Sequence, residues 1–350
     1  MHLTVSRELL PESEADRNEF LKKYFCELPA SATADGSGWK IRLARPTNPD
    51  FYIDPDLPAG LEWWSKSFGR TDVSGIPTAL HRARGWQLSL NDSWTLYSWS
   101  KWLEELDRGN GSPECITVLH LDDHDDLMTP RVAREEANAF RDLITGATVE
   151  LHRSETVAAA VTSGAIGIGS FMAPLLHQFR NVHVRHLCST EYIDSRKGPH
   201  AVSAVKVKDD LLAPGSLRPG LRLQKLNDST QLPGSHPYIV TDDLDVWLEN
   251  LPEGPVLLHI DMDYFNNRFN GDSDWVDEGP KYNPPLDQVL ARIDRVFGSL
   301  EHRSVAERVE DFAAAISPGF FPADLWEPSI ERIDAHVKRL LADGRWTTRE

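Results

Sequence analysis

Residues 116–126 read Ile-Thr-Val-Leu-His-Leu-Asp-Asp-His-Asp-Asp, so that an apolar run passes directly into a cluster of acids and histidines. A short run of β-branched and apolar residues is typical of a buried strand, and the cluster then lies at its carboxyl end. Residues 256–263, Val-Leu-Leu-His-Ile-Asp-Met-Asp, repeat the arrangement. Because sites in open α/β sheets form beyond the carboxyl ends of the strands, the two clusters are expected to meet.

The chain around these two strands alternates between strand and helix patterns. Short apolar runs predict strands over 85–90, 115–121, 182–187, 256–260 and 312–316. Apolar residues at helical spacing predict helices over 93–106, 131–143, 155–179 with a break at 164–169, 286–300 and 328–341. Residues 213–237 are interpreted as a Pro/Gly-containing connection. This alternation predicts an α/β fold with a mainly parallel sheet that helices flank on both faces.

Residues 1–84 differ from the rest in being rich in proline, glycine and aromatic residues in irregular order, with short helix signals only near residues 8–25. We interpret them as an N-terminal extension packed on the core domain, residues 85–350. Such an extension would frame a groove for a long substrate. An arm that builds a homo-oligomer is the alternative that the sequence leaves open.

Composition restricts the classes of partner. The chain has 350 residues, of which 40% are hydrophobic, three cysteines and a formal net charge of −17. That charge disfavours nucleic acid and anionic membranes as partners and is compatible with a basic, arginine-containing peptide. The first residues lack a signal-peptide pattern, and no apolar run approaches about 18 residues, so a cytoplasmic protein is expected.

The side chains of the two acidic clusters gather on single faces of their strands. Alternation places His120, Asp122 and His124 on one face of the first strand, and His259, Asp261 and Asp263 on one face of the second. Converging carboxylates repel one another without a counter-ion, and carboxylate with imidazole suits Mn, Zn or Fe. The sequence therefore predicts a metal site. A loop of solvated acids would explain either cluster alone, but it explains the two together less well.

Two spaced motifs follow these strands, Asp122-x-His124-x-Asp126 and Asp261-x-Asp263. They resemble, in the same order, the metal motifs of the ureohydrolases in the arginase and histone-deacetylase superfamily. With Tyr264-Phe265-Asn266 behind it, the second motif looks most like an arginase-related family that includes the peptide arginases of ribosomal natural-product pathways. Those enzymes turn arginine residues of a precursor peptide into ornithine. The resemblance covers about residues 85–330 and implies a three-layer arginase-like fold.

The resemblance also implies how the motifs would hold two divalent ions, most typically Mn²⁺. Asp122 and Asp261 would each contact both ions, and His124 and Asp263 would complete the site of one. Asp126 would serve the other ion and orient the water that attacks the substrate.

One ligand of the family pattern is absent from this sequence. Ureohydrolases usually add a histidine from a Gly-Asp-His-Ser loop, whereas the corresponding residues here are Leu90-Asn91-Asp92-Ser93-Trp94. Asp92 is the candidate for the vacant position, because a carboxylate is an acceptable ligand for Mn²⁺. The alternative is that Asp92 or Ser93 caps the helix that follows.

The sequence also contains candidate residues for proton transfer and for substrate binding. Residues 129–140 contain no histidine for the proton that the leaving amine needs, so His120 is the substitute candidate. Asp324 and Glu327, after the last predicted strand, are candidates for binding the guanidinium group. A helix-capping role for Glu327 is the alternative, and the loop 167–171 is a candidate source of backbone contacts to the substrate.

Three other functions remain open. An amide hydrolase of the same superfamily, either a deacetylase or an amidinohydrolase acting on a small amine, would use the same activated water. A metal phosphohydrolase or a nucleotide-sugar transferase would explain only one cluster each. A catalytically decayed module that binds a metal or a partner would explain the absent histidine.

Overall fold

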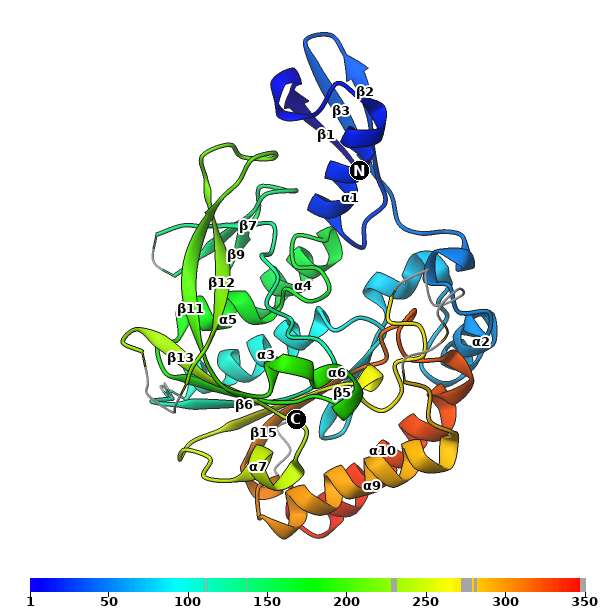
Figure 1. Cartoon of the computed structure of the whole chain (residues 1–350), viewed down its shortest axis with the longest axis vertical. Helices are drawn as coiled ribbons and strands as arrows, with labels where there is room; N and C mark the ends of the chain where they lie inside the picture. The colour runs from blue at the N-terminus through cyan, green and yellow to red at the C-terminus, as the bar shows by residue number, and fades with distance from the viewer. Residues whose placement is uncertain are drawn as a thin grey trace.

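The computed structural model describes residues 1–346 except 110, 112, 137, 228–231, 272–278 and 280–281, and it is an α/β structure built around one large mixed sheet (Figure 1). Among these residues, nine strands lie in the order β12-β11-β13-β10-β6-β14-β15-β5-β4. The six from β13 to β5 run parallel, whereas β12, β11 and β4 run antiparallel to their neighbours. The strand bounds are Leu80–Ala83 (β4), Trp86–Ser89 (β5), Ile116–Leu121 (β6), Val182–Leu187 (β10), Gly198–Lys208 (β11), Leu217–Lys225 (β12), Ser235–Thr241 (β13), Val256–Asp261 (β14) and Val309–Ala315 (β15).

Helices flank this sheet. One face shares an apolar cluster with α3 (Trp94–Arg108), α4 (Ser154–Ser163) and α5 (Met172–Gln178). The other face shares a second cluster with α2 (Leu57–Ser67), α7 (Leu244–Leu248), α9 (Leu286–His302) and α10 (Trp326–Ala342). The short helix α6 (Thr190–Ile193) follows β10. The short 3-10 helices are Arg7–Leu9, Pro49–Tyr52, Val73–Thr78, Asp194–Arg196, Met262–Tyr264, Ala306–Arg308 and Ala323–Leu325.

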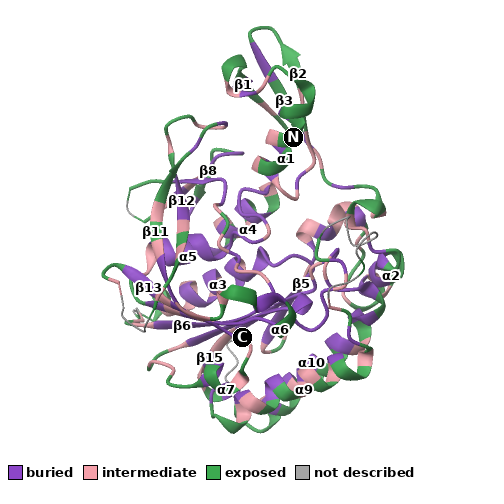
Figure 2. Ribbon diagram, in the orientation of Figure 1, coloured by how far each residue is buried: buried purple, intermediate pink, exposed green. Residues whose placement is uncertain are grey.

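Side-chain alternation divides β6 between the two clusters. Ile116 and Val118 belong to the cluster beneath α3, α4 and α5, whereas Leu119 and Leu121 belong to the cluster beneath α9 and α10. All six residues of β6 are buried, which fits a central strand covered on both faces (Figure 2). The parity of the strand therefore directs His120 toward α3, α4 and α5.

Most of the predicted elements are present, but the helix expected over 131–143 is wrong. Those residues contribute β7 (Val132–Arg134) and β8 (Phe140–Asp142), which form a small antiparallel sheet with β9 (Thr148–Val149). Two turns break the helical pattern: Asn138 adopts a φ of 63°, and Asp142 Oδ1 accepts hydrogen bonds from two backbone N–H groups. Apolar spacing alone did not reveal these turns.

The hairpin of β11 and β12 was missed, because no element was predicted over residues 198–208 and residues 213–237, which contain β12 and the start of β13, were interpreted as a connection. Many of its side chains are exposed, so it lacks the apolar run of a central strand. Pro219 and Gly220 further obscured β12, yet a proline is tolerated there because β12 lies at the edge of the sheet.

An N-terminal unit stands at the top of the molecule in Figure 1. It comprises a three-stranded antiparallel sheet in the order β1-β3-β2, with α1 packed against it. Its bounds are His2–Ser6 (β1), Glu14–Phe25 (α1), Ala30–Asp35 (β2) and Gly38–Leu43 (β3). The rest of residues 1–84 lies against the core, and β4 pairs with β5 in the main sheet. No helix of the described residues is long and apolar enough to cross a membrane.

Arg131 joins the N-terminal unit to the core. Its guanidinium donates hydrogen bonds to the carbonyl oxygens of Tyr24 (2.8 Å) and Gly164 (2.7 Å), and lies 3.5 Å from a carboxylate oxygen of Glu27. Only 6% of the Arg131 side chain is exposed. Removing one member of a buried ion pair leaves the other charge uncompensated, which destabilises a protein strongly.

We predict that Arg131→Gln lowers the free energy of unfolding by about 3 kcal/mol. Arg134→Gln, an exposed residue on the same short strand, is the matched control and should change that free energy by less than about 0.5 kcal/mol. Urea denaturation followed by circular dichroism measures both. Equal, small changes in the two variants would contradict the proposed connection.

Candidate metal centre

Three histidines form a row across neighbouring parallel strands. His186 on β10 and His259 on β14 are both in register with His120 on β6. All three side chains are fully buried. The imidazole of His186 donates from Nε2 to the carbonyl oxygen of Asp122 (2.9 Å), because a carbonyl can only accept. The row therefore lies directly beneath the loop that carries the first acidic cluster.

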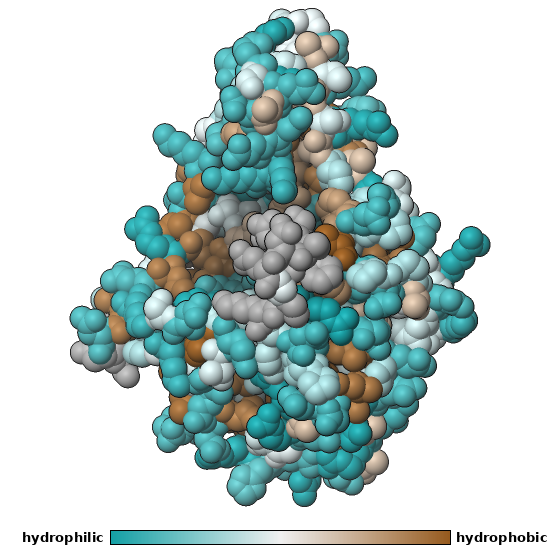
Figure 3. All heavy atoms as spheres, turned by 45° about the vertical axis from the view of Figure 1, so that its right-hand side comes forward, coloured by the Kyte–Doolittle hydropathy of each residue, from teal (hydrophilic) through white to brown (hydrophobic). Residues whose placement is uncertain are grey.

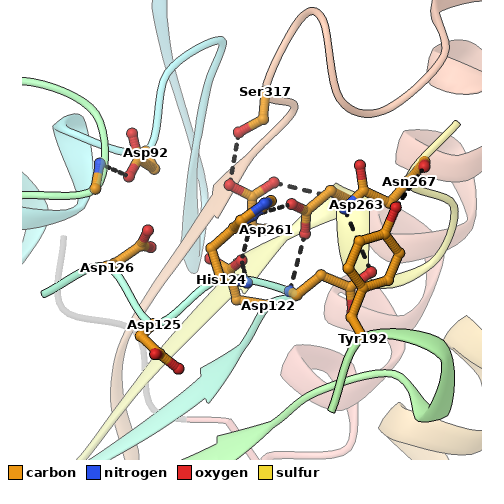
Figure 4. A network of polar contacts seen from close by, with 12 residues as sticks. Asp92, Asp122, His124, Asp125, Asp126, Tyr192, Asp261, Asp263, Asn267 and Ser317 are labelled. Carbon is orange, nitrogen blue, oxygen red and sulfur yellow. Dashed lines mark hydrogen bonds and ion pairs between the residues drawn. The ribbon is translucent and has the colours of Figure 1, made fainter. Parts of the chain in front are cut away.

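The predicted acidic ligands converge beyond the carboxyl ends of β6 and β14 (Figure 4). His124 Nδ1 lies 2.7 Å from Asp263 Oδ2 and 3.4 Å from Asp122 Oδ1. The hydroxyl group of Ser317 donates to Asp261 Oδ2 at 2.6 Å, which joins the loop after β15 to the cluster. Asp122, His124 and Asp263 thus come together as expected from their positions at two strand ends. Asp261 lies next to them, where its Oδ1 accepts a hydrogen bond from the backbone N–H of Asp263 at 3.3 Å, but it belongs to no group of ligand atoms close enough to hold a cation among the described residues.

Asp126 reaches the same cluster through an unusual backbone conformation. Its φ of 51° lies in the left-handed region, which aspartate tolerates better than most residues. One Asp126 carboxylate oxygen lies 4.0 Å from His120 Nε2. Asp125, the preceding residue, points away from the cluster and forms an ion pair with Arg196 at 2.9 Å. The turn therefore separates two adjacent acids into different environments.

The described residues contain two groups whose ligand atoms lie close enough to hold a cation. Asp122, His124 and Asp263 form one group, and His120, Asp122, Asp126 and His259 form the other. Within each group, one possible ligand atom from every residue lies within 4.8 Å of the others. Asp122 belongs to both groups.

Several carboxylate oxygens of this cluster are buried without a hydrogen-bond partner. They are Asp92 Oδ1, Asp122 Oδ2 and Asp126 Oδ2. An unpaired buried acceptor is costly, and a buried charge is normally paired or bound to a metal. The unsatisfied oxygens, together with imidazole nitrogen, are a ligand set that fits divalent manganese, iron or zinc.

The pKa shifts of the clustered acids, in the absence of a bound ion, agree with a site for a divalent cation. Burial, followed by repulsion from neighbouring carboxylates, raises the pKa of Asp122, Asp126 and Asp261 well above the usual value. Burial alone would lower the pKa of His124, but the adjacent Asp263 outweighs it and raises that pKa to about 10. Protons therefore compensate the buried negative charge when no metal ion is bound.

Asp92, the predicted substitute ligand, lies beside the cluster but in neither of the two groups found among the described residues. It is 3% exposed, and its Oδ2 accepts a hydrogen bond from the backbone N–H of Gly169 at 2.7 Å. Burial and then the charge of Asp126 raise its pKa. The capping alternative is not supported for Ser93, which precedes α3 without a side-chain capping bond. The side chain of Asp92 bonds to Gly169 through Oδ2, and its Oδ1 has no hydrogen-bond partner.

His120, the predicted proton donor, uses both ring nitrogens within the protein. Its Nε2 donates to the carbonyl oxygen of His124 at 3.0 Å, and its Nδ1 lies 2.9 Å from His259 Nδ1. Burial and the neighbouring imidazole of His186 lower the pKa of His120 well below its usual value. A neutral ring carries one proton, so His120 has none left to offer a substrate.

The structure brings neither predicted substrate-binding acid into the metal groups. Asp324 forms an ion pair with Arg268 at 3.0 Å. Glu327 is exposed in the first turn of α10, where an acid interacts favourably with the helix dipole. It also lines a separate cavity with Trp86, at the amino end of β5 and therefore away from the carboxyl ends of the strands.

Sequence reasoning interpreted His186 as an ordinary core or surface residue and missed the contact of Ser317 with Asp261. It placed His259 on the same face as Asp261 and Asp263 but did not name it as a ligand. A signal for the histidine row is present, because three strands end in related tripeptides: His120-Leu121-Asp122, His186-Leu187-Cys188 and His259-Ile260-Asp261. Comparison of the chain with protein-family models and with curated proteins found no match.

The raised pKa of Asp126 gives a pH-dependent prediction for the metal-free protein. A carboxyl group whose pKa is higher in the folded state than in the unfolded state binds its proton more tightly when folded. Stability therefore falls as pH rises from the unfolded value, about 3.9, toward the raised value. Asn cannot ionise, so Asp126→Asn should raise the melting temperature in chelator at pH 7.5, and the difference should shrink toward pH 4.

With Mn²⁺ present the wild-type protein should have the higher melting temperature, because it gains the free energy of metal binding and the Asp126→Asn variant gains less. Differential scanning calorimetry in chelator and in Mn²⁺ measures both cases. An Asp126→Asn variant that is less stable than wild type by the same amount in both conditions would contradict a metal-compensated cluster.

Proposed function

We propose that this chain is a metal-dependent hydrolase that holds two divalent ions, most typically Mn²⁺, at the cluster around Asp122. The position of Asp122 carries the proposal, because its two carboxylate oxygens face the two ligand groups. Oδ1 lies 3.4 Å from His124 Nδ1, and Oδ2 lies 3.8 Å from His120 Nε2. A carboxylate in that position suits a bridge between two cations.

We further propose a three-layer arginase-like fold for the core. Six central parallel strands, helices against both apolar faces and acidic motifs at the carboxyl ends support this assignment. The order of the motifs, Asp122-x-His124-x-Asp126 before Asp261-x-Asp263, agrees with the resemblance to ureohydrolases.

The proposed reaction is hydrolysis of the guanidinium group of an arginine residue in a peptide. Water adds to the central guanidinium carbon, the bond from that carbon to the side-chain nitrogen breaks, and this nitrogen gains a proton. The products are an ornithine residue and urea. Bound divalent ions would supply a water molecule of lowered pKa and compensate the charge that develops on the substrate.

The residues of the chain have distinct parts in this proposal. Asp122, His124, Asp126, Asp261 and Asp263 would hold the ions, with Ser317 fixing the orientation of Asp261 through its hydrogen bond. Asp126 would also accept a hydrogen bond from the attacking water and so direct it toward the carbon.

A peptide substrate is favoured by charge and by shape. The net charge of −17 attracts a cationic ligand. The N-terminal unit and the hairpin of β11 and β12 project beyond the helices that flank the sheet (Figure 1). Apolar side chains gather in the hollow beneath the N-terminal unit, on a face that is otherwise mostly hydrophilic (Figure 3). These elements would contact residues on either side of the target arginine.

We predict that an arginine-containing peptide incubated with the Mn²⁺-loaded protein loses about 42 Da per modified arginine, the mass change for ornithine formation by hydrolysis. Asp261→Asn should lower the rate by on the order of 10³-fold, because it removes a metal ligand. Asp311→Asn, which changes a half-buried acid bonded to Ser98 near the start of β15, is the control and should retain activity.

Mass spectrometry of the peptide and a urea assay provide the readouts. A gain of about 1 Da would indicate citrulline, and hydrolysis of an acylated amine without urea would indicate the amide-hydrolase alternative. Either product would exclude the arginase reaction.

A further inference from the structure

We propose that His259 supplies the nitrogen ligand of the second ion and replaces the histidine that the loop after β5 lacks. His120 acts as a positioning residue that fixes the orientation and protonation of His259. This inference rests on the proposed function, since it concerns how the same site holds its second ion.

Strand register brings His259 to this position. His259 and His120 face each other on the adjacent strands β14 and β6, and both are fully buried. One ring nitrogen of His259 lies within 4.8 Å of a carboxylate oxygen of Asp122 and one of Asp126. The same group contains a ring nitrogen of His120, but both nitrogens of that ring are engaged within the protein, with His259 and with the carbonyl oxygen of His124. The second ion would therefore have two oxygen ligands and one nitrogen ligand, from His259.

The hydrogen bonds of the two rings determine which nitrogen of His259 is free. The carbonyl oxygen of His124 can only accept, so His120 Nε2 carries a proton and His120 Nδ1 has none. His259 Nδ1 must then donate to His120 Nδ1, across 2.9 Å. His259 Nε2 is left without a proton, and it is buried without a hydrogen-bond partner.

A buried, unprotonated imidazole nitrogen in a ring that lies beside carboxylates has the chemistry of a metal ligand. His236 Nδ1 is also buried without a partner, but among the described residues His236 belongs to neither ligand group. Metal-binding histidines normally donate their other ring N–H to a second group, which fixes the ring, and His120 provides that acceptor for His259. The same chain of hydrogen bonds ends on the backbone of His124, a ligand of the first ion. His120 thus connects the ligand sets of the two ions.

Asp92 fits the vacant position less well. One of its oxygens already accepts the Gly169 N–H, so only Oδ1 lacks a hydrogen-bond partner. Its carboxylate instead holds the loop 167–170 against the cluster, where a Cβ atom added at Gly169 would lie 3.5 Å from Asp126 Oδ1.

The test is metal binding by the full chain, measured without substrate. Metal-free wild type, His259→Gln, Asp92→Asn and His236→Gln are titrated with Mn²⁺ by calorimetry, and bound metal is counted by elemental analysis. His236 is the matched control, because it is a buried histidine whose Nε2 donates to the carbonyl oxygen of Leu176.

We expect two ions per chain in wild type, Asp92→Asn and His236→Gln. His259→Gln should keep the first ion and weaken the second by at least about 10- to 100-fold. The inference is overturned if the His259→Gln variant binds two ions with wild-type affinity. It is also overturned if the Asp92→Asn variant, and not His259→Gln, loses the second ion.

Pulsed electron paramagnetic resonance of the wild-type protein decides the matter even if His259→Gln fails to fold. Histidine labelled with ¹⁵N should show nitrogen coupling to both Mn²⁺ ions, from His124 at the first and His259 at the second. If the protein binds two ions but nitrogen coupling is seen at only one of them, the inference is wrong, whereas the proposed function is not contradicted. A wild-type protein that binds no ion overturns both.

Discussion

Buried negative charge at the carboxyl edge of the sheet is the constraint on which the rest of this structure depends. Six aspartates, Asp92, Asp122, Asp123, Asp126, Asp261 and Asp263, lie at less than 10% exposure within one small region. Such charges cannot coexist in an apolar interior without compensation. In the metal-free chain protons supply it, through acids of raised pKa and a protonated His124. In the proposed enzyme two cations replace those protons.

The sheet and the histidine row make this concentration of charge geometrically stable. Parallel pairing of β10, β6 and β14 sets His186, His120 and His259 at one level, and two of these rings bond to carbonyl oxygens of the loop after β6. The loop is thereby fixed from below. Backbone bonds of this kind preserve the arrangement of the acids even when their charges repel, which is the preorganisation that a metal site needs.

Local patterns predicted the parts of this site that depend on one strand at a time. Parity alone placed Asp122 with His124 and Asp261 with Asp263, because alternation is a property of a single strand. The contact between His120 and His259 depends on the order of strands in the sheet, which no local pattern records. The direction of the Asp126 side chain depends on the left-handed backbone conformation of Asp126 itself. The strands β7 and β8, found where a helix was expected over 131–143, depend on turns at Asn138 and Asp142. Apolar periodicity carries no information about either.

Anomalous diffraction from crystals of the full chain soaked in Mn²⁺ tests the central claim most directly, because it locates each ion among the side chains. We predict two anomalous peaks at the carboxyl edge of the sheet, one beside His124 and Asp263 and the other beside Asp126, with Asp122 between them. The absence of any peak at this edge, with the acids unchanged, would contradict the claim that the buried charge exists to hold metal ions.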